Sequence, residues 1–433
     1  MKTKTVKLLY GRSGMVLRVP ADAVVLEGKD IQAIADPTAA VAEAMANPIG
    51  SPALSELISN KQPRTVTITI SDITRPVPNK VFLPSMLDAL NAAGVADSQI
   101  TIVIGTGMHR PSTPEEREIL LGEIQSRVEV TDHTADKPDT LVKVSDDPPV
   151  SVNRRFAEAD FRIVTGFIES HFMAGFSGGR KGVCPALVDL ETIERFHGYD
   201  ALSDRRADAG VLEGNPCHEI ALKIARTVGV DFLFNVAITR DRRIAGIYCG
   251  DLEAAHQAGC KDVAEWTSAE IKGPFDLVIT NGGGYALDTT FYQAVKGMCG
   301  AMPALGPDST LLIASACSEG LGSKPFAELI LSYGGDWRRF LSDIAAAETV
   351  RLDQWEFQMR ARVLERIGLE RLWFVSDGIE QEIQKRIGVT SILGDGDAQL
   401  RAQRAIDEFV SANPAARIAV LPDGPYTLLR RNS

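Results

Sequence analysis

Runs of apolar, β-branched residues alternate with amphipathic segments along most of the chain. The run Phe161–Phe167 is apolar at almost every position, as in a strand that is buried on both faces. Similar runs at 65–72 and 100–108 are each followed by a polar loop and then by a segment with the 3.6-residue spacing of a helix. A repeated order of strand, polar loop and helix is typical of parallel α/β architecture.

The place where this pattern begins and the place where it restarts indicate two domains. Two alternating runs at 5–10 and 15–19, joined by GRSG, predict an N-terminal hairpin. The order of strand, loop and helix restarts after Lys272-Gly273-Pro274, and 433 residues are too many for one ordinary core. We expect two α/β domains, 1–272 and a smaller 273–433, with mainly parallel, Rossmann-like sheets and an active-site cleft between them. The final strand could return to the first domain.

Charge and cysteine content narrow the function classes. The net charge of −11 and the pI of about 5.2 argue against a nucleic-acid binder. The first 20 residues have no apolar core of a signal peptide, and no run is long enough to span a membrane, so we expect a cytoplasmic protein without a membrane partner. The six cysteines lack CxxC spacing, which predicts reduced thiols.

Chargeable side chains follow three of the predicted strands. Asp72 and Arg75 follow the first, His109 the second and His171 the third. Ligands of parallel sheets bind beyond the carboxyl ends of the strands. If the three strands are neighbours, these four side chains converge, although each alone could be a turn, cap or surface residue.

The segment 175–198 carries a second candidate site. Gly178 and Gly179 permit close backbone approach, and Arg180 and Lys181 add two cations, so the turn could hold an anion. A short helix capped by Asp189 should follow and place His197 at its C-terminus. Taken singly, a glycine turn is more often a plain loop, and a terminal histidine more often a cap.

The ordered motifs resemble the nickel-dependent lactate racemase family. They are SDITRPVPNK, GTGMHR, ESHFMAGFSGGRKGVCPA, ERFHG, NGGGYALDTTFYQAVKG and DQWE, between about residues 71 and 356. The resemblance implies a nickel-pincer nucleotide, that is, a pyridinium-3,5-bisthiocarboxylic acid mononucleotide nickel complex, tethered to Lys181 with His197 as the protein ligand to nickel. It implies His109 and His171 as paired acid/base groups, and Arg75 and Lys296 as ligands of the substrate carboxylate. The remaining implied contacts are Asp72, Thr74, Gly178, Gly179 and Arg180 near the cofactor, and Tyr292, Gln293 and Trp355 near the substrate.

The implied reaction is racemisation or epimerisation of a 2-hydroxy acid. The α-hydrogen beside an ionised carboxylate is weakly acidic, so removal as hydride, with a base taking the hydroxyl proton, avoids a carbanion. Dedicated proteins that build the cofactor are also implied. Gly182 and Ala186 depart from the serine and glycine of the family pattern, which leaves open which acid is the substrate.

Two other functions stay open at this point. A nicotinamide-dependent dehydrogenase, or a lyase-like enzyme without nickel, could use the same loops, although NGGGY is not the GxGxxG fingerprint. A non-catalytic protein that binds a carboxylate or a nucleotide is the third possibility. The sequence does not indicate the oligomeric state.

Overall fold

A computed structural model describes residues 2–431, which divide into two compact units. Unit 1 comprises the segment up to Lys29, Gly198–Ser203 and the chain from Trp266 onward; unit 2 comprises Asp30–His197 and Asp204–Glu265. The sequence-based boundary at residue 272 lies close to the crossing at Trp266. The first 29 residues differ from expectation, because they belong with the C-terminal part.

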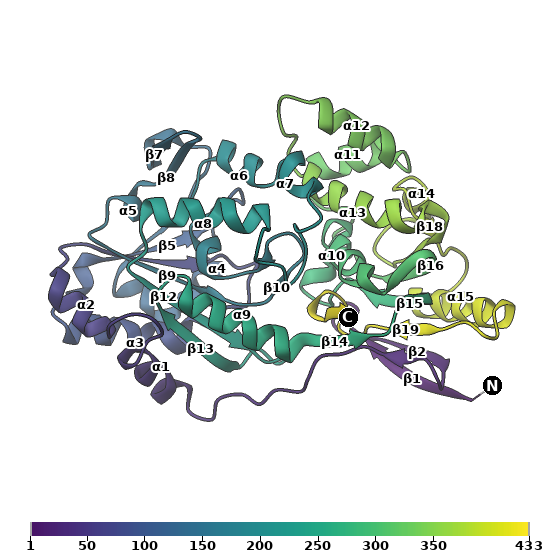
Figure 1. The fold of residues 1–433 in the computed structure, drawn as a ribbon, viewed down its shortest axis with the longest axis horizontal. Coiled ribbons are helices and arrows are strands. Elements are labelled where there is room, and N and C mark those ends of the chain that lie inside the picture. The colour runs from purple at the N-terminus through teal and green to yellow at the C-terminus, as the bar shows by residue number, and fades with distance from the viewer. Residues whose placement is uncertain (1, 432–433) are drawn as a thin grey trace. The chain divides into compact units, whose positions relative to one another are not determined.

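Unit 2 is built on a sheet with the strand order β13-β12-β9-β4-β5-β6, in which all neighbours are parallel except β12 and β13 (Figure 1). Its strands are β4 (Val66–Ser71), β5 (Ile100–Gly105), β6 (Glu129–Asp132), β9 (Phe161–Phe167), β12 (Phe232–Ile238) and β13 (Ile244–Gly250). Its helices are α1 (Pro37–Ala46), α2 (Leu54–Lys61), α3 (Asn79–Ala92), α4 (Pro114–Leu121), α5 (Arg154–Ala157), α6 (Leu190–Phe196), α8 (Pro216–Val228) and α9 (Ala254–Thr267).

One face of this sheet carries the main apolar core of unit 2. Side chains of α1, α2 and α3 pack there on alternate residues of β4, β5 and β9, including Ile68, Ile102 and Ile163. The other face receives the short 3-10 turn Gly179–Gly182, on which α8 packs. Strands buried on both faces explain the near-continuous apolar runs in the sequence.

Two hairpins complete unit 2. They are β7 (Leu141–Asp146) with β8 (Pro149–Asn153), and β10 (Ser170–His171) with β11 (Gly175–Phe176). The segment 131–155, which is rich in Asp, Pro and Lys, therefore contains an ordered strand pair. The run RDRRIAGIYCGD contains the single strand β13.

Unit 1 has a parallel sheet with the order β18-β17-β16-β15-β19-β3. The strands are β3 (Val24–Val25), β15 (Phe275–Asn281), β16 (Leu305–Ala314), β17 (Leu372–Val375), β18 (Thr390–Ser391) and β19 (Ile418–Val420). The helices are α7 (Tyr199–Ser203), α10 (Phe291–Ala301), α11 (Lys324–Tyr333), α12 (Trp337–Ala346), α13 (Gln354–Ile367), α14 (Gln381–Gln384) and α15 (Ala398–Ala412).

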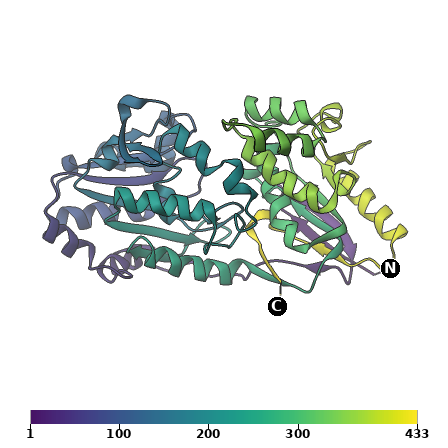
Figure 2. The same cartoon turned by 45° about the horizontal axis from the view of Figure 1, so that its top comes forward.

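The N-terminal hairpin belongs to unit 1 for reasons of packing. Strands β1 (Thr3–Leu8) and β2 (Met15–Pro20) pair antiparallel as predicted, and Figure 2 shows this hairpin in purple. Their Leu8 and Leu17 share a core with Leu277 of β15. The last strand, β20 (Leu428–Arg431), pairs in parallel with β14 (Ser268–Ile271), which lies in unit 1 as well.

The structure confirms the predicted fold class of mixed α/β with mainly parallel sheets. All six cysteines are buried thiols and none is in a disulfide, also as predicted. Within residues 2–431, no helix is both long enough and apolar enough to cross a bilayer.

Candidate functional site

Strands β9, β4 and β5 are parallel neighbours, with β4 in the middle. Asp72 and Arg75 therefore leave the sheet between the loop that carries His109 and the hairpin that carries His171. The condition set by the sequence, that these strands lie side by side, is confirmed. The carboxyl edge of the sheet brings acid, base and cation within reach of one another.

Asp72 and His109 form a hydrogen-bonded pair. The Asp72 Oδ2 atom lies 2.7 Å from His109 Nδ1, and Asp72 Oδ1 accepts hydrogen bonds from the Thr74 hydroxyl and backbone N–H. Burial raises the pKa of Asp72, but the bonds from His109 and Thr74 and the charge of Arg75 outweigh it and hold the pKa below its ordinary value. An ionised Asp72 fixes the Nδ1–H tautomer of His109, which leaves the lone pair on Nε2.

Arg75 is held by an acid that sequence reasoning did not assign. Its Nη1 atom lies 3.2 Å from Glu169 Oε1, and both side chains are part-buried. A two-point guanidinium fork can bind a carboxylate, so Glu169 occupies a position that a substrate carboxylate could take or share. The position of Glu169 in the sequence could have identified it, because it lies just after β9 and two residues before His171.

His171 is nearly buried, with 9% of its surface exposed. Its Nδ1 atom accepts hydrogen bonds from the backbone N–H groups of Met173 and Ala174, at 3.3 and 3.2 Å. The ring therefore carries its lone pair on Nδ1 and its proton on Nε2. His109 and His171 thus have opposite tautomers.

The glycine turn is anchored by a buried asparagine. Asn235 Oδ1, from β12, accepts the N–H of Gly179 at 2.7 Å. Gly178 has φ 72° and ψ −170°, and a Cβ there would lie 2.6 Å from the same Oδ1. Asn235 was missed as a site residue, although an amide inside the apolar run VDFLFNVAIT was a usable signal.

Gly178→Ala is expected to lower the free energy of unfolding by about 2–4 kcal/mol, because backbone strain and a clash with Asn235 add together. Gly94→Ala is the matched control: Gly94 also has positive φ, but its added Cβ meets no atom within 4 Å. Urea unfolding followed by circular dichroism should show the larger loss for Gly178→Ala. Equal losses in the two variants would contradict the tight fit of the turn.

Arg180 is a buried cation held by neutral groups. It is 1% exposed, and it donates to the carbonyls of Ala174 and Gly178 and contacts His256 Nε2 at 3.1 Å. Its Nε atom is buried without a hydrogen-bond partner. Burial lowers the pKa of Arg180 to about 10, so the guanidinium stays charged near neutral pH.

Lys181 and His197 meet at the ring of Phe196. The Lys181 Nζ atom lies 5.0 Å from the ring centroid, and the His197 ring packs edge-on at 4.6 Å between centroids. Burial first, then the charges of Arg180 and Arg75, lower the pKa of Lys181 to about 7. Burial and the Lys181 charge lower the pKa of His197 to about 3, and His197 Nδ1–H donates to the Ile193 carbonyl at 2.9 Å. The neutral ring therefore carries its lone pair on Nε2, the form that ligates a metal.

Gly182, which differs from the serine expected from the family resemblance, is closely packed against β9. A Cβ at this position would lie 2.4 Å from Val164 Cγ1 of β9. A serine could enter only if Val164 moved, so the departure matches the local packing.

The remaining expected residues lie in unit 1. Tyr292, Gln293 and Lys296 lie on α10, and Trp355 lies at the start of α13, where its indole N–H donates to the Tyr292 hydroxyl at 2.8 Å. Gln293 Oε1 is buried without a hydrogen-bond partner. Glu356, which sequence reasoning left unassigned although it ends the DQWE motif, is 1% exposed and interacts electrostatically with Lys296.

The pKa of Glu356 is raised, because burial disfavours its charge; Lys296 opposes this shift and Asp353 adds to it. The folded state thus holds the proton more tightly than the unfolded state, and stability falls as the pH rises from the ordinary glutamate range through the raised pKa. The glutamine of Glu356→Gln cannot ionise. The free energy of unfolding of this variant, relative to that of the parent, should therefore rise by about 1–3 kcal/mol between pH 5 and pH 9.

Urea unfolding followed by tryptophan fluorescence measures this gain, because all four tryptophans belong to unit 1. Glu348→Gln, at an exposed position of the same unit, is the control. A stability difference for Glu356→Gln that does not change with pH would contradict the buried, protonated carboxyl.

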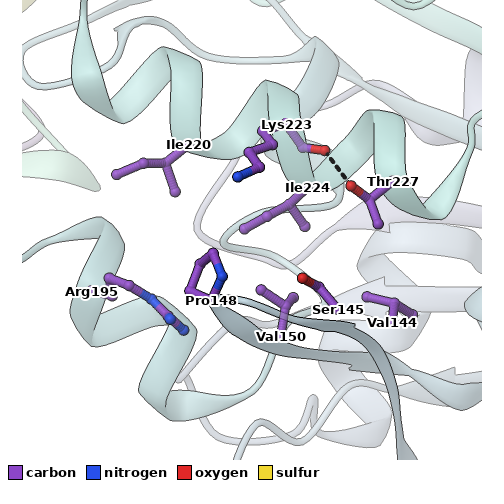
Figure 3. A pocket seen from close by; sticks show the side chains of 9 residues that line it. All are labelled: Val144, Ser145, Pro148, Val150, Arg195, Ile220, Lys223, Ile224 and Thr227. Carbon is purple, nitrogen blue, oxygen red and sulfur yellow. Dashed lines mark hydrogen bonds between the residues drawn. The ribbon is translucent and has the colours of Figure 1, made fainter.

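A separate hollow of about 140 Å³ lies elsewhere in unit 2, between the β7–β8 hairpin, α6 and α8 (Figure 3). Its apolar side chains point from the hairpin and α8 toward one another, and Arg195 and Lys223 flank them. It contains none of the residues expected at the site. Its lining residues are Val144, Ser145, Pro148, Val150, Arg195, Ile220, Lys223, Ile224 and Thr227.

Comparisons with known proteins agree with the geometry. Residues 10–210 match a family model described as the lactate racemase N-terminal domain, and residues 271–428 match one described as the lactate racemase C-terminal domain. The lactate racemase of Lactiplantibacillus plantarum is 35% identical over 397 residues, which cover 89% of each chain. That of Thermoanaerobacterium thermosaccharolyticum is 32% identical over 407 residues, or 90% of each chain.

Solved structures give the same result. The lactate racemase apoprotein of T. thermosaccharolyticum superposes with a TM-score of 0.88 at 29% identity, covering 99% of this chain and 100% of that one. A Thermotoga maritima protein, at 17% identity and a TM-score of 0.64 over 89% of this chain and 100% of its own, shares the fold. The chain belongs to the lactate racemase family, and it is an enzyme of the isomerase class.

Proposed function

We propose that this protein is a racemase or epimerase of lactate or a related 2-hydroxy acid, and that it uses a nickel-pincer nucleotide tethered to Lys181. One observation carries the proposal. The part-buried amine of Lys181, whose pKa is lowered, and the neutral imidazole of His197 both pack against the ring of Phe196. An amine that is partly neutral near pH 7 can act as a nucleophile toward the cofactor.

The residues present suit such a cofactor. Arg180 is a buried cation whose Nε lacks a partner, and Gly178 and Gly179 open the backbone beside it, so the turn favours an anionic group. His197 offers one neutral imidazole to a metal, and the pincer sulfurs would complete the ligand set. Asp72 and Thr74, proposed beside the cofactor from the family pattern, also orient His109 in this structure.

The protein's own groups bind the substrate and move its proton. Arg75 would exchange Glu169 for the substrate carboxylate and so fix the orientation of the acid. His109 and His171 would act as paired acid/base groups on either side of the substrate: one takes the hydroxyl proton and the other returns a proton to the oxygen. When bound, the cofactor supplies an electron-poor centre for the α-hydrogen and its electron pair.

The family resemblance also leads us to propose substrate contacts for four residues of unit 1. Lys296 would pair with the carboxylate, and Tyr292, Gln293 and Trp355 would shape the pocket for the rest of the acid. The orphaned Gln293 oxygen is an acceptor for a substrate hydroxyl. Tyr292→Phe, which removes the acceptor of the Trp355 indole N–H, should therefore alter the selectivity of the enzyme among 2-hydroxy acids.

The nicotinamide alternative is disfavoured by the contacts of the NGGGY loop. The Tyr285 N–H donates to the Gly11 carbonyl, the Gly11 N–H donates to Asp288 Oδ2, and the Arg12 guanidinium stacks 3.4 Å from the centre of the Tyr285 ring. The loop after β15, where a Rossmann fold would bind a pyrophosphate, thus binds the chain's own hairpin.

The proposal is tested with protein produced together with the cofactor-building enzymes. Such protein should carry nickel and added covalent mass after denaturation, and it should convert one enantiomer of lactate or another 2-hydroxy acid into the other in a chiral assay. A loosely bound dinucleotide that washes out would support a dehydrogenase, and ligand binding without any change of chirality would support a carrier.

A further inference from the structure

We infer that Glu169 is a specificity-determining residue: its carboxylate, held beside Arg75, disfavours a 2-hydroxy acid that carries a second carboxylate. The inference rests on the proposed function, in which Arg75 binds the substrate carboxylate. It goes beyond that function, because it gives a role to a residue outside the proposed contacts and separates monocarboxylic substrates from dicarboxylic acids.

The contact between Arg75 and Glu169 uses one arm of the guanidinium. Arg75 Nη1 donates to Glu169 Oε1 at 3.2 Å, and the two side chains are 30% and 23% exposed. Glu169 is the one side chain within residues 2–431 that hydrogen-bonds this guanidinium. A guanidinium fork can bind a carboxylate at two nitrogens. A substrate carboxylate therefore either lies next to Glu169 on this fork or takes its place.

The backbone of Glu169 is fixed on both sides by Ser177. The Glu169 N–H donates to Ser177 Oγ at 2.9 Å, and the Ser177 N–H donates to the Glu169 carbonyl at 2.9 Å. Ser177 Oγ in turn donates to the carbonyl of Phe167, the last residue of β9. Glu169 can therefore turn its side chain but cannot withdraw its backbone from Arg75. A displaced Glu169 carboxylate stays close to the bound substrate.

Two acids already share the charge of Arg75 before a substrate arrives. Asp72 interacts electrostatically with the guanidinium, while its own oxygens are hydrogen-bonded to His109 and Thr74. Glu169 is the second acid. A monocarboxylate adds one more negative charge at this place, and a dicarboxylate adds two. Charges in part-buried positions are only weakly screened, so the second charge costs affinity that a neutral group of similar size does not.

The other cations proposed at the site do not compensate a second carboxylate. Lys181 interacts electrostatically with Arg75, but it is the proposed tether, and its nitrogen loses the positive charge once it is acylated. Arg180 is 1% exposed and donates to backbone carbonyls, so a substrate does not reach it. Lys296 of unit 1 is proposed to bind the same carboxylate as Arg75. A second carboxylate therefore meets the charge of Glu169 without a cation of its own.

The test compares two acids that differ in charge at one end. Malate has the carbon chain of 2-hydroxybutanoate, with a carboxylate in place of the terminal methyl group. Isothermal titration calorimetry on the complete protein, carrying its cofactor, measures Kd for both acids. The parent should bind 2-hydroxybutanoate more tightly than malate, by about tenfold or more.

Glu169→Gln keeps the size of the side chain and an acceptor oxygen for Arg75, but it removes the charge. The preference for 2-hydroxybutanoate should narrow by about tenfold, because malate binds more tightly to this variant. The affinity for 2-hydroxybutanoate should not fall. General damage to the site would instead weaken the binding of both acids, which separates a role in specificity from a purely structural one.

Glu158→Gln is the matched control. Glu158 Oε1 lies 3.0 Å from Arg154 Nη1 in an exposed ion pair of the same unit, and its substitution should leave both Kd values unchanged. An unchanged preference in Glu169→Gln would overturn the inference. A parent that binds malate as tightly as 2-hydroxybutanoate would overturn it as well.

These binding measurements do not depend on turnover. The predicted preference in a protein that never inverts chirality would support the role of Glu169 and contradict the proposed function. Racemisation together with an unchanged preference in Glu169→Gln would do the reverse. If neither acid bound, both the inference and the proposed function would be wrong.

Discussion

Lys181→Ala is expected to abolish both the covalently attached mass and the racemase activity, lowering kcat/KM by about 10⁴-fold or more. The reason is that the alanine removes the only atom proposed to form a covalent tether to the cofactor, and Arg180 beside it is a guanidinium that remains charged near neutral pH. Intact-mass analysis of denatured protein, made alongside the cofactor-building enzymes, measures the attachment directly.

The matched control for this experiment is Lys223→Ala. Lys223 is an exposed lysine of the same unit, on α8, and its loss should leave mass shift and turnover unchanged. Lys181→Arg is a stricter variant, because it preserves positive charge without a comparable nucleophile. If Lys181→Ala retained both the added mass and the activity, the proposed covalent attachment at Lys181 would be wrong.

Asp72→Asn is expected to lower kcat by about 10²–10⁴-fold with little change in stability or cofactor content. Thr74 donates its backbone N–H and its hydroxyl to Asp72 Oδ1, so the amide oxygen of an asparagine should remain at that position. The amide NH₂ would then face His109 Nδ1 and force it to accept. The proton of the ring would move to Nε2, the atom that must act as the base.

The control for Asp72→Asn is Asp97→Asn, which changes the same atoms in a part-exposed ion pair with Arg127. Parallel pH–rate profiles, intact masses and ¹⁵N spectra of the two variants separate loss of the tautomer from general damage. A fully active Asp72→Asn variant would mean that the carboxylate does not orient His109 during turnover.

The parallel sheets could be predicted because burial on both faces leaves long apolar runs in the sequence. The adjacency of β9, β4 and β5 could only be stated as a condition, since pairing between distant strands leaves no local signal. The place of the N-terminal hairpin was missed for the same reason: Leu8 and Leu17 pack on Leu277, far along the chain.

The site shows a similar division. His109, His171, Lys181 and His197 were named from motifs, but their proton positions depend on partners that the sequence does not reveal. Asn235, Glu169 and Glu356 were missed as site residues, because the residues that they contact, Gly179, Arg75 and Lys296, lie far from them in the sequence. The helices α12 and α15 carry none of the family motifs and were not predicted.

The central claim of the proposed function is that the α-hydrogen leaves and returns as a hydride within one site. The most direct test is to supply one enantiomer of an α-deuterated 2-hydroxy acid in ordinary water and to analyse the opposite enantiomer by mass spectrometry. The account predicts that the product keeps its deuterium and forms more slowly than the unlabelled acid. Product that has exchanged its deuterium for solvent hydrogen would show removal as a proton and would contradict the account.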